Sequence, residues 1–513
     1  MLELSPILPI AWLLVSLGLL KMTAYKACLI GLTISGIEAI SLWQMDYVLA
    51  MKAIVEGSVF ALLPIIWVIV AAFFAYNISL YTGAITPIKQ FMSSLSGDRR
   101  IQALLIAWGF GGFLEAVAGF GTAVAVPAAL LIALGFEPFL AAVVCIFANT
   151  AAVAFGVVGI PVNTLAQIAE LPILPISMAI VWQLAPFGVL VPLLIVVTIT
   201  KSLKGLRGVW LTTLVSGISF GLAQFVVAKY AGPELPAIIG SIFAFLATVF
   251  SAKVSPPRKN WKFPREREAA ASFAKDQTIR LKEQMVAWMP YILLLILVLL
   301  TSKLVPILNE LVGEVASSWL IYDGAGGKPL IIQWFLTPGT LVLISAILGG
   351  LIQGASLLQL VKLYVQTVCQ LRKTMITIMS IVSMAKVLGY SGMIGSIAVT
   401  LAGVTGHFYP LIAPSIGALG TFITGSDTSS NILFGQLQKQ TALQLGINPV
   451  WIAAANASGA CIGKLISPQS IAIATIATGL TGREGELLTV TVKYAIGFLF
   501  ALGGLTYAFA FLV

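Results

Sequence analysis

Residues 412–437 read IAPSIGALGTFITGSDTSSNILFGQL, and a polar septet inside this apolar run indicates the kind of fold that the chain adopts. From Gly425 to Asn431 seven consecutive residues are small or polar, whereas the residues on either side are mostly apolar. A break in a helix at membrane depth frees N–H and C=O groups, which are tolerable only where protein or a hydrated cavity satisfies them. The septet therefore predicts a helix that is broken inside a membrane, although a loop between two short helices also fits it.

A second pair of breaks indicates that this pattern occurs once in each half of the chain. The spacing N-x6-G-x4-P occurs twice, beginning at Asn149 and at Asn456. A GxxT element precedes each copy, Gly119–Thr122 by thirty residues and Gly425–Thr428 by thirty-one. The joint spacing favours an internal duplication over coincidence. Paired repeats with discontinuous helices are typical of secondary transporters.

The composition excludes a soluble globule. Of the 513 residues 59% are hydrophobic and 9% are charged, whereas a soluble domain has about a quarter of its residues charged. Apolar runs of about 20 residues recur along the whole chain, and each is long enough to cross a bilayer as a helix. We expect an all-α polytopic membrane protein with about 12 to 14 transmembrane segments and two repeats that contain broken helices or re-entrant hairpins.

A basic stretch near the middle predicts both the orientation and the division of the chain. Between Lys253 and Glu283 there are nine Lys or Arg residues and four acids, which gives half of the formal net charge of +10. Such loops usually face the cytoplasm and contact lipid, so we expect no nucleic-acid partner. The stretch Asn309–Gly327 contains three acids and no Lys or Arg, which places it outside. The predicted parts are an N-terminal membrane half, 1–252, with repeat motifs at 109–165; a basic cytoplasmic loop, 253–284; and a C-terminal membrane half, 285–513, with repeat motifs at 414–475.

Enzymatic chemistry has little support in the residues. The four cysteines are widely spaced and form no CxxC pair, and the one histidine leaves no pair for a zinc site. No HExxH motif occurs, and the single GxSxG sequence, at 217–221, lies in an apolar run with no histidine near it in the chain. We therefore expect no enzyme activity, no metal and no cofactor.

Cationic residues near the breaks are candidates for binding an anion. An ionisable side chain at mid-bilayer costs at least about 2.5 to 3.5 kcal/mol, so such residues are functional candidates by default. Lys464, close behind the Gly463 break, is the best placed, and Lys386 is the second candidate. His407 is a further candidate, although it also fits the role of capping a loop before Pro410.

Two acids near the breaks are candidates for carrying a proton. Glu115 lies four residues before Gly119, and Asp427 lies inside the polar septet. A carboxyl group desolvated in a membrane can load and release protons near neutral pH, as a proton-coupled carrier requires. Each acid could instead only neutralise a nearby lysine, and the sequence does not decide between the two.

Three long motifs resemble the bacterial lactate permease family. They are GFGGFLEAVAGFGTAVAVPAALLIALGF at 109–136, GTFITGSDTSSNILFGQLQ at 420–438 and AAANASGACIGKLISPQSIAIA at 453–474. The resemblance implies uptake of L-lactate, and often of D-lactate and glycolate, in symport with a proton across the bacterial cytoplasmic (inner) membrane. It also places the chain in a wider group of ion transporters with inverted repeats and hairpin tips, which often move as an elevator. The motifs that carry the resemblance include neither the basic loop nor the stretch 309–327.

Together these features predict a site between the tips of the two repeats. Lys464 would be the countercharge for the substrate carboxylate, while Glu115 and Asp427 compete for the proton. The other residues expected to bind substrate are Gly119, Gly121, Thr122, Asn149, Ser426, Thr428, Ser429, Asn431 and Asn456. The alternatives are a sodium-coupled carboxylate symporter, an anion channel and, least favoured, a membrane enzyme. The expected partners are lactate or glycolate, protons and the lipid bilayer, and the chain is expected to act alone or as a homodimer.

Overall fold

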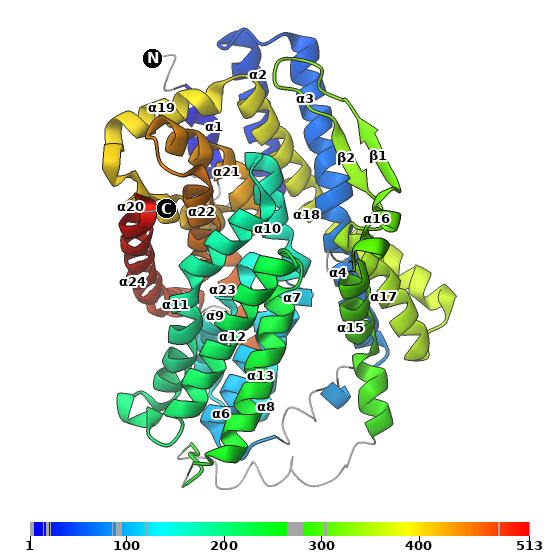
Figure 1. Cartoon of the computed structure of the whole chain (residues 1–513), viewed down its shortest axis with the longest axis vertical. Helices are drawn as coiled ribbons and strands as arrows, with labels where there is room; N and C mark the ends of the chain where they lie inside the picture. Colours follow the sequence, from blue (N-terminus) through cyan, green and yellow to red (C-terminus); the bar gives the residue numbers. More distant parts are fainter. Residues whose placement is uncertain are drawn as a thin grey trace.

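The computed structural model describes residues 5–13, 15–16, 20, 22–84, 86–88, 95–117, 119, 121–257, 259–263, 281–301, 305–480 and 483–511 (Figure 1). Most of the predicted basic loop, at 264–280, lies outside the described residues, as does Phe120 in the first GxxT element.

The first half of the chain is helical wherever it is described as regular structure. Its elements are α1 (Ile7–Leu13), α2 (Ala24–Ser41), α3 (Tyr47–Phe60), η3 (Ala61–Ile66), α4 (Trp67–Tyr81), α6 (Arg99–Ala103), η4 (Leu104–Phe110), α7 (Gly111–Val117), α8 (Thr122–Ala133), α9 (Pro138–Asn149), η5 (Val153–Phe155), α10 (Gly156–Ala169), α11 (Ile173–Thr200), η6 (Leu203–Leu206), α12 (Trp210–Tyr230) and α13 (Pro236–Val254).

The second half adds one small sheet to its helices. Its elements are α15 (Leu281–Thr301), α16 (Pro306–Gly313), β1 (Ala316–Trp319), β2 (Leu330–Gln333), α17 (Pro338–Ile352), α18 (Leu357–Tyr390), α19 (Met393–Thr405), η7 (Gly406–Phe408), α20 (Tyr409–Thr424), α21 (Asp427–Gln444), α22 (Pro449–Gly463), α23 (Pro468–Thr478) and α24 (Glu484–Ala510). The strands pair antiparallel with Ala316 opposite Gln333, and this hairpin lies within and just after the acidic stretch predicted to be outside.

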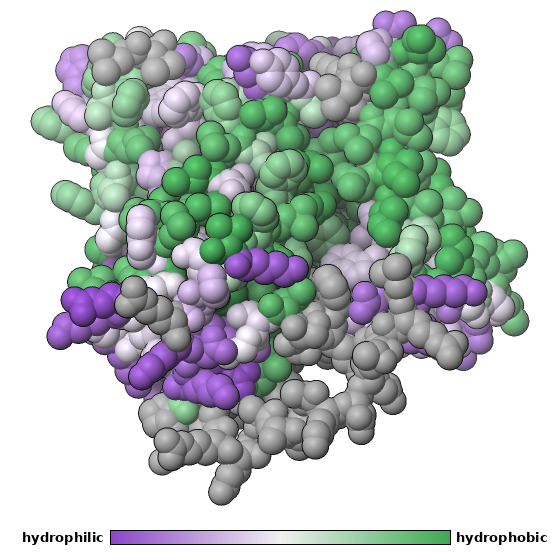
Figure 2. Space-filling view, turned by 60° about the horizontal axis from the view of Figure 1, so that its bottom comes forward, coloured by the Kyte–Doolittle hydropathy of each residue, from purple (hydrophilic) through white to green (hydrophobic). Residues whose placement is uncertain are grey.

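The helices of the described chain are suited to a bilayer, as the composition predicts. Nine of them are long and apolar enough to cross a membrane, and a tenth span results if α9 and the bent segment after it count as one. The 12 to 14 crossings expected from the sequence would need shorter segments as well, such as α17. Figure 2 shows a broad hydrophobic band of the surface between hydrophilic patches. The chain is therefore an all-α polytopic membrane protein with broken helices.

The two repeats pack crosswise. In the first, α7 and α8 flank one break and α9 and α10 flank the other; in the second, α20 and α21 correspond to the first pair, and α22 and α23 to the second. Helix α10 packs on α21 and helix α8 packs on α23, so each repeat contacts the other through the helices that follow its breaks. The breaks of both repeats consequently approach one another in the middle of the molecule.

Glycines allow the helices of the second repeat to approach closely. A Cβ added at Gly459 would collide with the carbonyl oxygen of Pro414, and one added at Gly417 would collide with the carbonyl oxygen of Asn456. Small residues at such contacts let membrane helices pack backbone to backbone. The α20–α22 contact therefore supports the two half-helices on which the polar septet and Lys464 are placed.

Three basic segments meet at one end of the molecule. Arg100 pairs with Asp98 at 2.7 Å and also donates to the carbonyls of Gly205 and Arg207. The Trp261 backbone N–H donates to the same aspartate at 2.9 Å, which fixes the start of the basic loop at this end. In Figure 1 this end is at the bottom and the β1–β2 hairpin is at the upper right. The orientation of the two ends toward cytoplasm and exterior stays a prediction.

Candidate substrate-binding site

Both copies of the N-x6-G-x4-P motif break at the same place. In the first, Val157, Val158 and Gly159 have non-helical, positive φ angles of 45°, 55° and 76°. In the second, α22 ends at Gly463 and α23 begins at Pro468. In each case the helix is lost between the motif glycine and the motif proline, because neither residue supports a continuous ladder there. The prediction of paired broken helices is confirmed.

The GxxT elements form the other pair of breaks. Gly119 and Gly425 both have positive φ, 56° and 75°, directly after the first half-helix of their repeat. Gly121, with φ of 88°, precedes the first residue of α8, Thr122. Glycine adopts the left-handed conformation without the steric penalty that other residues incur, so Gly119 and Gly425 can follow the end of a helix.

The polar septet caps the half-helix that follows it. The Ser426 hydroxyl accepts a hydrogen bond from the Ser429 N–H at 3.3 Å, so these two residues form the N-terminal cap of α21. Thr428 is half-buried in the first turn of the same helix. The cap directs the N-terminus of α21, with its partial positive charge, toward the break.

Three charged side chains converge where the breaks meet. Glu115 and Asp427 are both buried, with 4% and 2% of their surface exposed. Each interacts electrostatically with Lys464, and the two acids interact with one another. The Lys464 ammonium donates to the Gly425 carbonyl at 3.2 Å, at the C-terminal end of α20. The structure thus brings together the predicted countercharge and both predicted proton carriers.

Several oxygens of this cluster have no hydrogen-bond partner within the described part of the chain. They are Glu115 Oε2, Asp427 Oδ1 and Asn149 Oδ1. The Asn149 amide donates to Glu115, and the Cys461 thiol donates to Asp427 Oδ2 at 3.6 Å. A buried acceptor without a donor is costly, so these oxygens are suited to a proton, a water or a ligand hydroxyl.

The second motif asparagine has a different environment from the first. Asn456 donates to Asn431 at 2.9 Å and accepts from Gln438 at 3.2 Å, and Tyr409 donates to that glutamine at 2.7 Å. Asn431 in turn donates to the Pro161 carbonyl at 3.2 Å, which joins the second repeat to the first. Asn431 and Asn456 therefore hold the breaks in position, whereas the Asn149 oxygen is left unpartnered among the described residues.

The two secondary cationic candidates lie elsewhere. His407 is exposed in η7, and its ring packs against Phe511 with centroids 5.9 Å apart. Lys386 pairs with Glu56 at 2.7 Å, in a second polar cluster between α3 and α18. Glu56 was not among the predicted site residues, although it is the one acid between Ala50 and Ala75, a mostly apolar stretch whose other charge is Lys52, and that was its signal.

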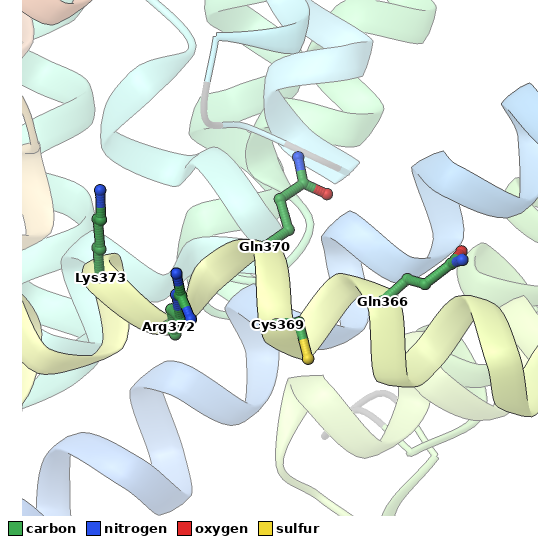
Figure 3. Close-up of a pocket in the computed structure, with 5 residues that line it drawn as sticks. All are labelled: Gln366, Cys369, Gln370, Arg372 and Lys373. Carbon is green, nitrogen blue, oxygen red and sulfur yellow. The ribbon is translucent and has the colours of Figure 1, made fainter.

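A shallow hollow on α18 does not add to the site. Figure 3 shows its lining side chains, Gln366, Cys369, Gln370, Arg372 and Lys373, which all come from this one helix. Because these side chains share a single helix, they do not converge on a common centre.

Comparison with known proteins identifies the family. A family model described as L-lactate permease matches residues 3–513. The chain belongs to the L-lactate permease family. An L-lactate permease of Streptococcus iniae is 43% identical over 455 residues, which cover 89% of this chain and 94% of that protein. A glycolate permease of Escherichia coli (strain K12) is 34% identical over 533 residues, which cover 98% of this chain and 94% of that protein. The resemblance seen in the three motifs is confirmed, and members of this L-lactate permease family are transporters rather than enzymes.

Two solved structures of transporters align with most of the permease chain. MtrF of Neisseria gonorrhoeae, described as illuminating a class of antimetabolite efflux pumps, aligns with a TM-score of 0.49 at 15% identity, covering 90% of this chain and 84% of its own. The YdaH transporter of Alcanivorax borkumensis aligns with a TM-score of 0.46 at 13% identity, covering 86% and 84%.

Proposed function

We propose that this permease is a secondary active transporter that carries L-lactate into the cell in symport with a proton, and that it also accepts D-lactate and glycolate. Membership of the L-lactate permease family, together with the similarity to a glycolate permease, supports lactate and glycolate as substrates. The choice of proton as the coupling ion rests on one observation, the convergence of Glu115, Asp427 and Lys464 at the meeting point of the breaks.

The charges of this cluster support a ratio of one proton to one lactate. With one of its two carboxyls protonated, the cluster of two acids and one lysine has no net charge. A lactate anion would leave it negative in a low-dielectric interior, where an uncompensated charge is expensive. Protonation of the second carboxyl restores neutrality. Binding of the anion and binding of one proton therefore support each other.

The Lys464 ammonium has a second role in this scheme. In the structure it donates to the carbonyl of Gly425, at the negative end of α20. It also has two further N–H donors. A substrate carboxylate beside it would lie near the capped N-terminus of α21, which also favours an anion. The 2-hydroxyl of lactate or glycolate is a donor that the unpartnered Asn149 oxygen can accept.

Uptake of labelled L-lactate into proteoliposomes tests the proposal. A pH gradient with the more acidic solution outside should drive lactate accumulation, with and without sodium, because the coupling ion is the proton. An imposed voltage without a pH gradient should drive none, because one anion and one proton together carry no net charge. Accumulation that needs sodium, or that follows voltage, would contradict proton symport.

The sodium-coupled alternative has one supporting observation. The unpartnered oxygens of Glu115, Asp427 and Asn149 are ligands that a sodium ion also accepts. Replacing sodium by choline during uptake separates the two, since only a sodium symporter would lose accumulation. An anion channel would show flux without any accumulation against a gradient.

We propose that the protein lies in the bacterial cytoplasmic membrane with residues 253–284 in the cytoplasm. The positive-inside rule supports the orientation, because the basic segments around Arg100, Arg207 and Trp261 meet at one end. The mass of the purified protein by light scattering, with detergent subtracted, decides between monomer and homodimer.

A further inference from the structure

A second polar cluster lies in a large cavity that the proposed transport site does not use. The cavity has a volume of about 1140 Å³ and is lined by residues of both halves, among them Glu56, Lys386 and Tyr390. Small-molecule pockets have volumes of about 300 to 1000 Å³, so this one is large enough for a small organic anion with its water. It lies beside the β1–β2 hairpin, which we expect to be outside.

Glu56 is the centre of the cluster and is held from three directions. Its Oε1 pairs with Lys386 at 2.7 Å and accepts from the Tyr390 hydroxyl at 2.6 Å. Its Oε2 accepts from the Tyr322 backbone N–H at 3.1 Å. The rings of Tyr322 and Tyr390 stack with centroids 3.8 Å apart, which fixes both donors. Glu56 would therefore keep two donors if Lys386 turned partly toward another anion.

Lys386 has donor capacity left over. Its ammonium carries three N–H bonds, and within the described residues it bonds to Glu56 and, at 3.4 Å, to the Tyr390 hydroxyl. A quarter of its side chain is exposed, on the side of the cavity, whereas the Glu56 side chain is 4% exposed. The rings of Phe60 and Tyr390 lie 5.6 and 5.2 Å from the ammonium and form apolar walls beside it.

The break of α10 forms part of the cavity wall. Val158 and Ile160 line the cavity. On the other side of the same break, a Cβ added at Gly156 would lie 3.1 Å from Glu115 Oε1. One strained segment of backbone therefore separates the cavity from the central cluster.

The loop of the hairpin, between β1 and β2, contributes Lys328 and Pro329 to the lining and covers the cavity there. Two ion pairs attach this loop to neighbouring helices. Asp323 pairs with Lys52 of α3 at 2.6 Å, and Lys328 pairs with Glu170 at the end of α10 at 2.7 Å. The hydrogen bond from Lys52 holds the pKa of the Asp323 carboxyl below its usual range. Both pairs are largely exposed and thus weak, so this cover can open.

We propose that Lys386 binds the carboxylate group of a small monocarboxylate in this cavity, as a second binding site that precedes the central one on the way in. The ligand carboxylate would accept from the one N–H bond of Lys386 that Glu56 and Tyr390 leave free, while its short carbon chain contacts Phe60 and Tyr390. The cavity also contains Glu170, Glu234, Glu310 and Glu314, which repel an anion. Binding at Lys386 is therefore expected to be weaker than at Lys464, as suits a site that passes its ligand onward. The identity of the ligand rests on the proposed function.

Equilibrium binding of labelled L-lactate to the purified full-length protein tests the second site. The wild type should bind about two molecules per chain, and Lys386→Gln and Lys464→Gln about one each, because each variant removes one countercharge. Lys362→Gln is the matched control: it removes an exposed lysine of the same helix, α18, that does not line the cavity, and it should leave the stoichiometry unchanged. In proteoliposomes, Lys386→Gln should raise the half-saturating lactate concentration about tenfold with little change in the maximal rate.

If Lys386→Gln fails to fold because Glu56 is left without its ion pair, the double variant Glu56→Gln/Lys386→Gln removes both charges and keeps the same expectation. A wild type that transports lactate but binds one molecule, lost only in Lys464→Gln, would overturn the second site and leave the proposed function standing. If the wild type binds lactate, loses this binding only in Lys386→Gln and does not transport lactate, the proposed function is overturned and the second site stands. A wild type that binds none would overturn both.

Discussion

Lys464 and Val157 each follow the motif glycine of their repeat, so one break has a cation where the other has an apolar side chain. The first break contributes an acid, Glu115, and an unpartnered amide oxygen on Asn149, whereas the second contributes the cation and Asp427. A duplicated fold therefore contains a site of unlike halves. Such a site can hold an anion and a proton at once.

Replacing Lys464 by Ala should abolish or severely weaken lactate binding at the central site. The variant leaves two buried acids and a substrate anion without a countercharge, which costs about 3 kcal/mol or more, at least about a hundredfold in affinity. Isothermal calorimetry on folded protein measures the affinity, and Lys493→Ala, at an exposed lysine of α24, is the matched control. Native affinity in the Lys464 variant would show that Lys386 or a helix terminus supplies the countercharge.

The variants Glu115→Gln and Asp427→Asn should identify the proton carrier. Each imitates a permanently protonated group, so the variant of the true carrier should retain lactate counterflow and lose pH-driven uptake. The other variant should lose both activities or neither, since its acid only supports the structure. Both activities are measured in the same proteoliposomes. If both variants accumulate lactate fully, the proton travels elsewhere or enters on lactic acid itself.

At the scale of elements, the breaks could be predicted from sequence and their contacts could not. Gly, Pro and a polar septet inside apolar runs interrupt the helical hydrogen-bond ladder, so the positions of the four breaks follow from residue type. The spacing gave no means of telling that Asn456 is fully hydrogen-bonded and Asn149 is not, because their partners, Gln438 and Glu115, lie on other helices. The β1–β2 hairpin escaped prediction because each strand has only four residues.

Gly459→Ala should destabilise the contact between α20 and α22. The new methyl group would meet the backbone carbonyl of Pro414, which cannot move without its helix. Overpacking of this kind costs about 1 to 3 kcal/mol. Thermal unfolding in detergent should show a lower midpoint for this variant. Gly497→Ala, in α24, adds a methyl group with no described atom within 4 Å and should leave the midpoint unchanged or raise it; equal midpoints for the two variants would argue against the close contact.

For the whole molecule, the charge distribution predicts which end faces the cytoplasm. A cysteine placed at Asp323 should react with a membrane-impermeant reagent on intact cells, whereas one placed at Lys259 should react only after lysis. Both positions are exposed, so access alone decides the result. Cys369, the exposed native cysteine among the four, is replaced by Ser in the background. The opposite labelling pattern would invert the orientation.

The crosswise packing of the repeats also bears on how the protein is made. Helix α10 packs on α21, and the Pro161 carbonyl accepts its hydrogen bond from Asn431, 270 residues later in the chain. During synthesis the first half enters the membrane well before that partner exists. Until then the non-helical backbone at Val157–Gly159 has to be shielded by membrane chaperones or by the insertion machinery. A first half expressed alone should be a substrate for membrane proteases, and co-expression of the second half should rescue it.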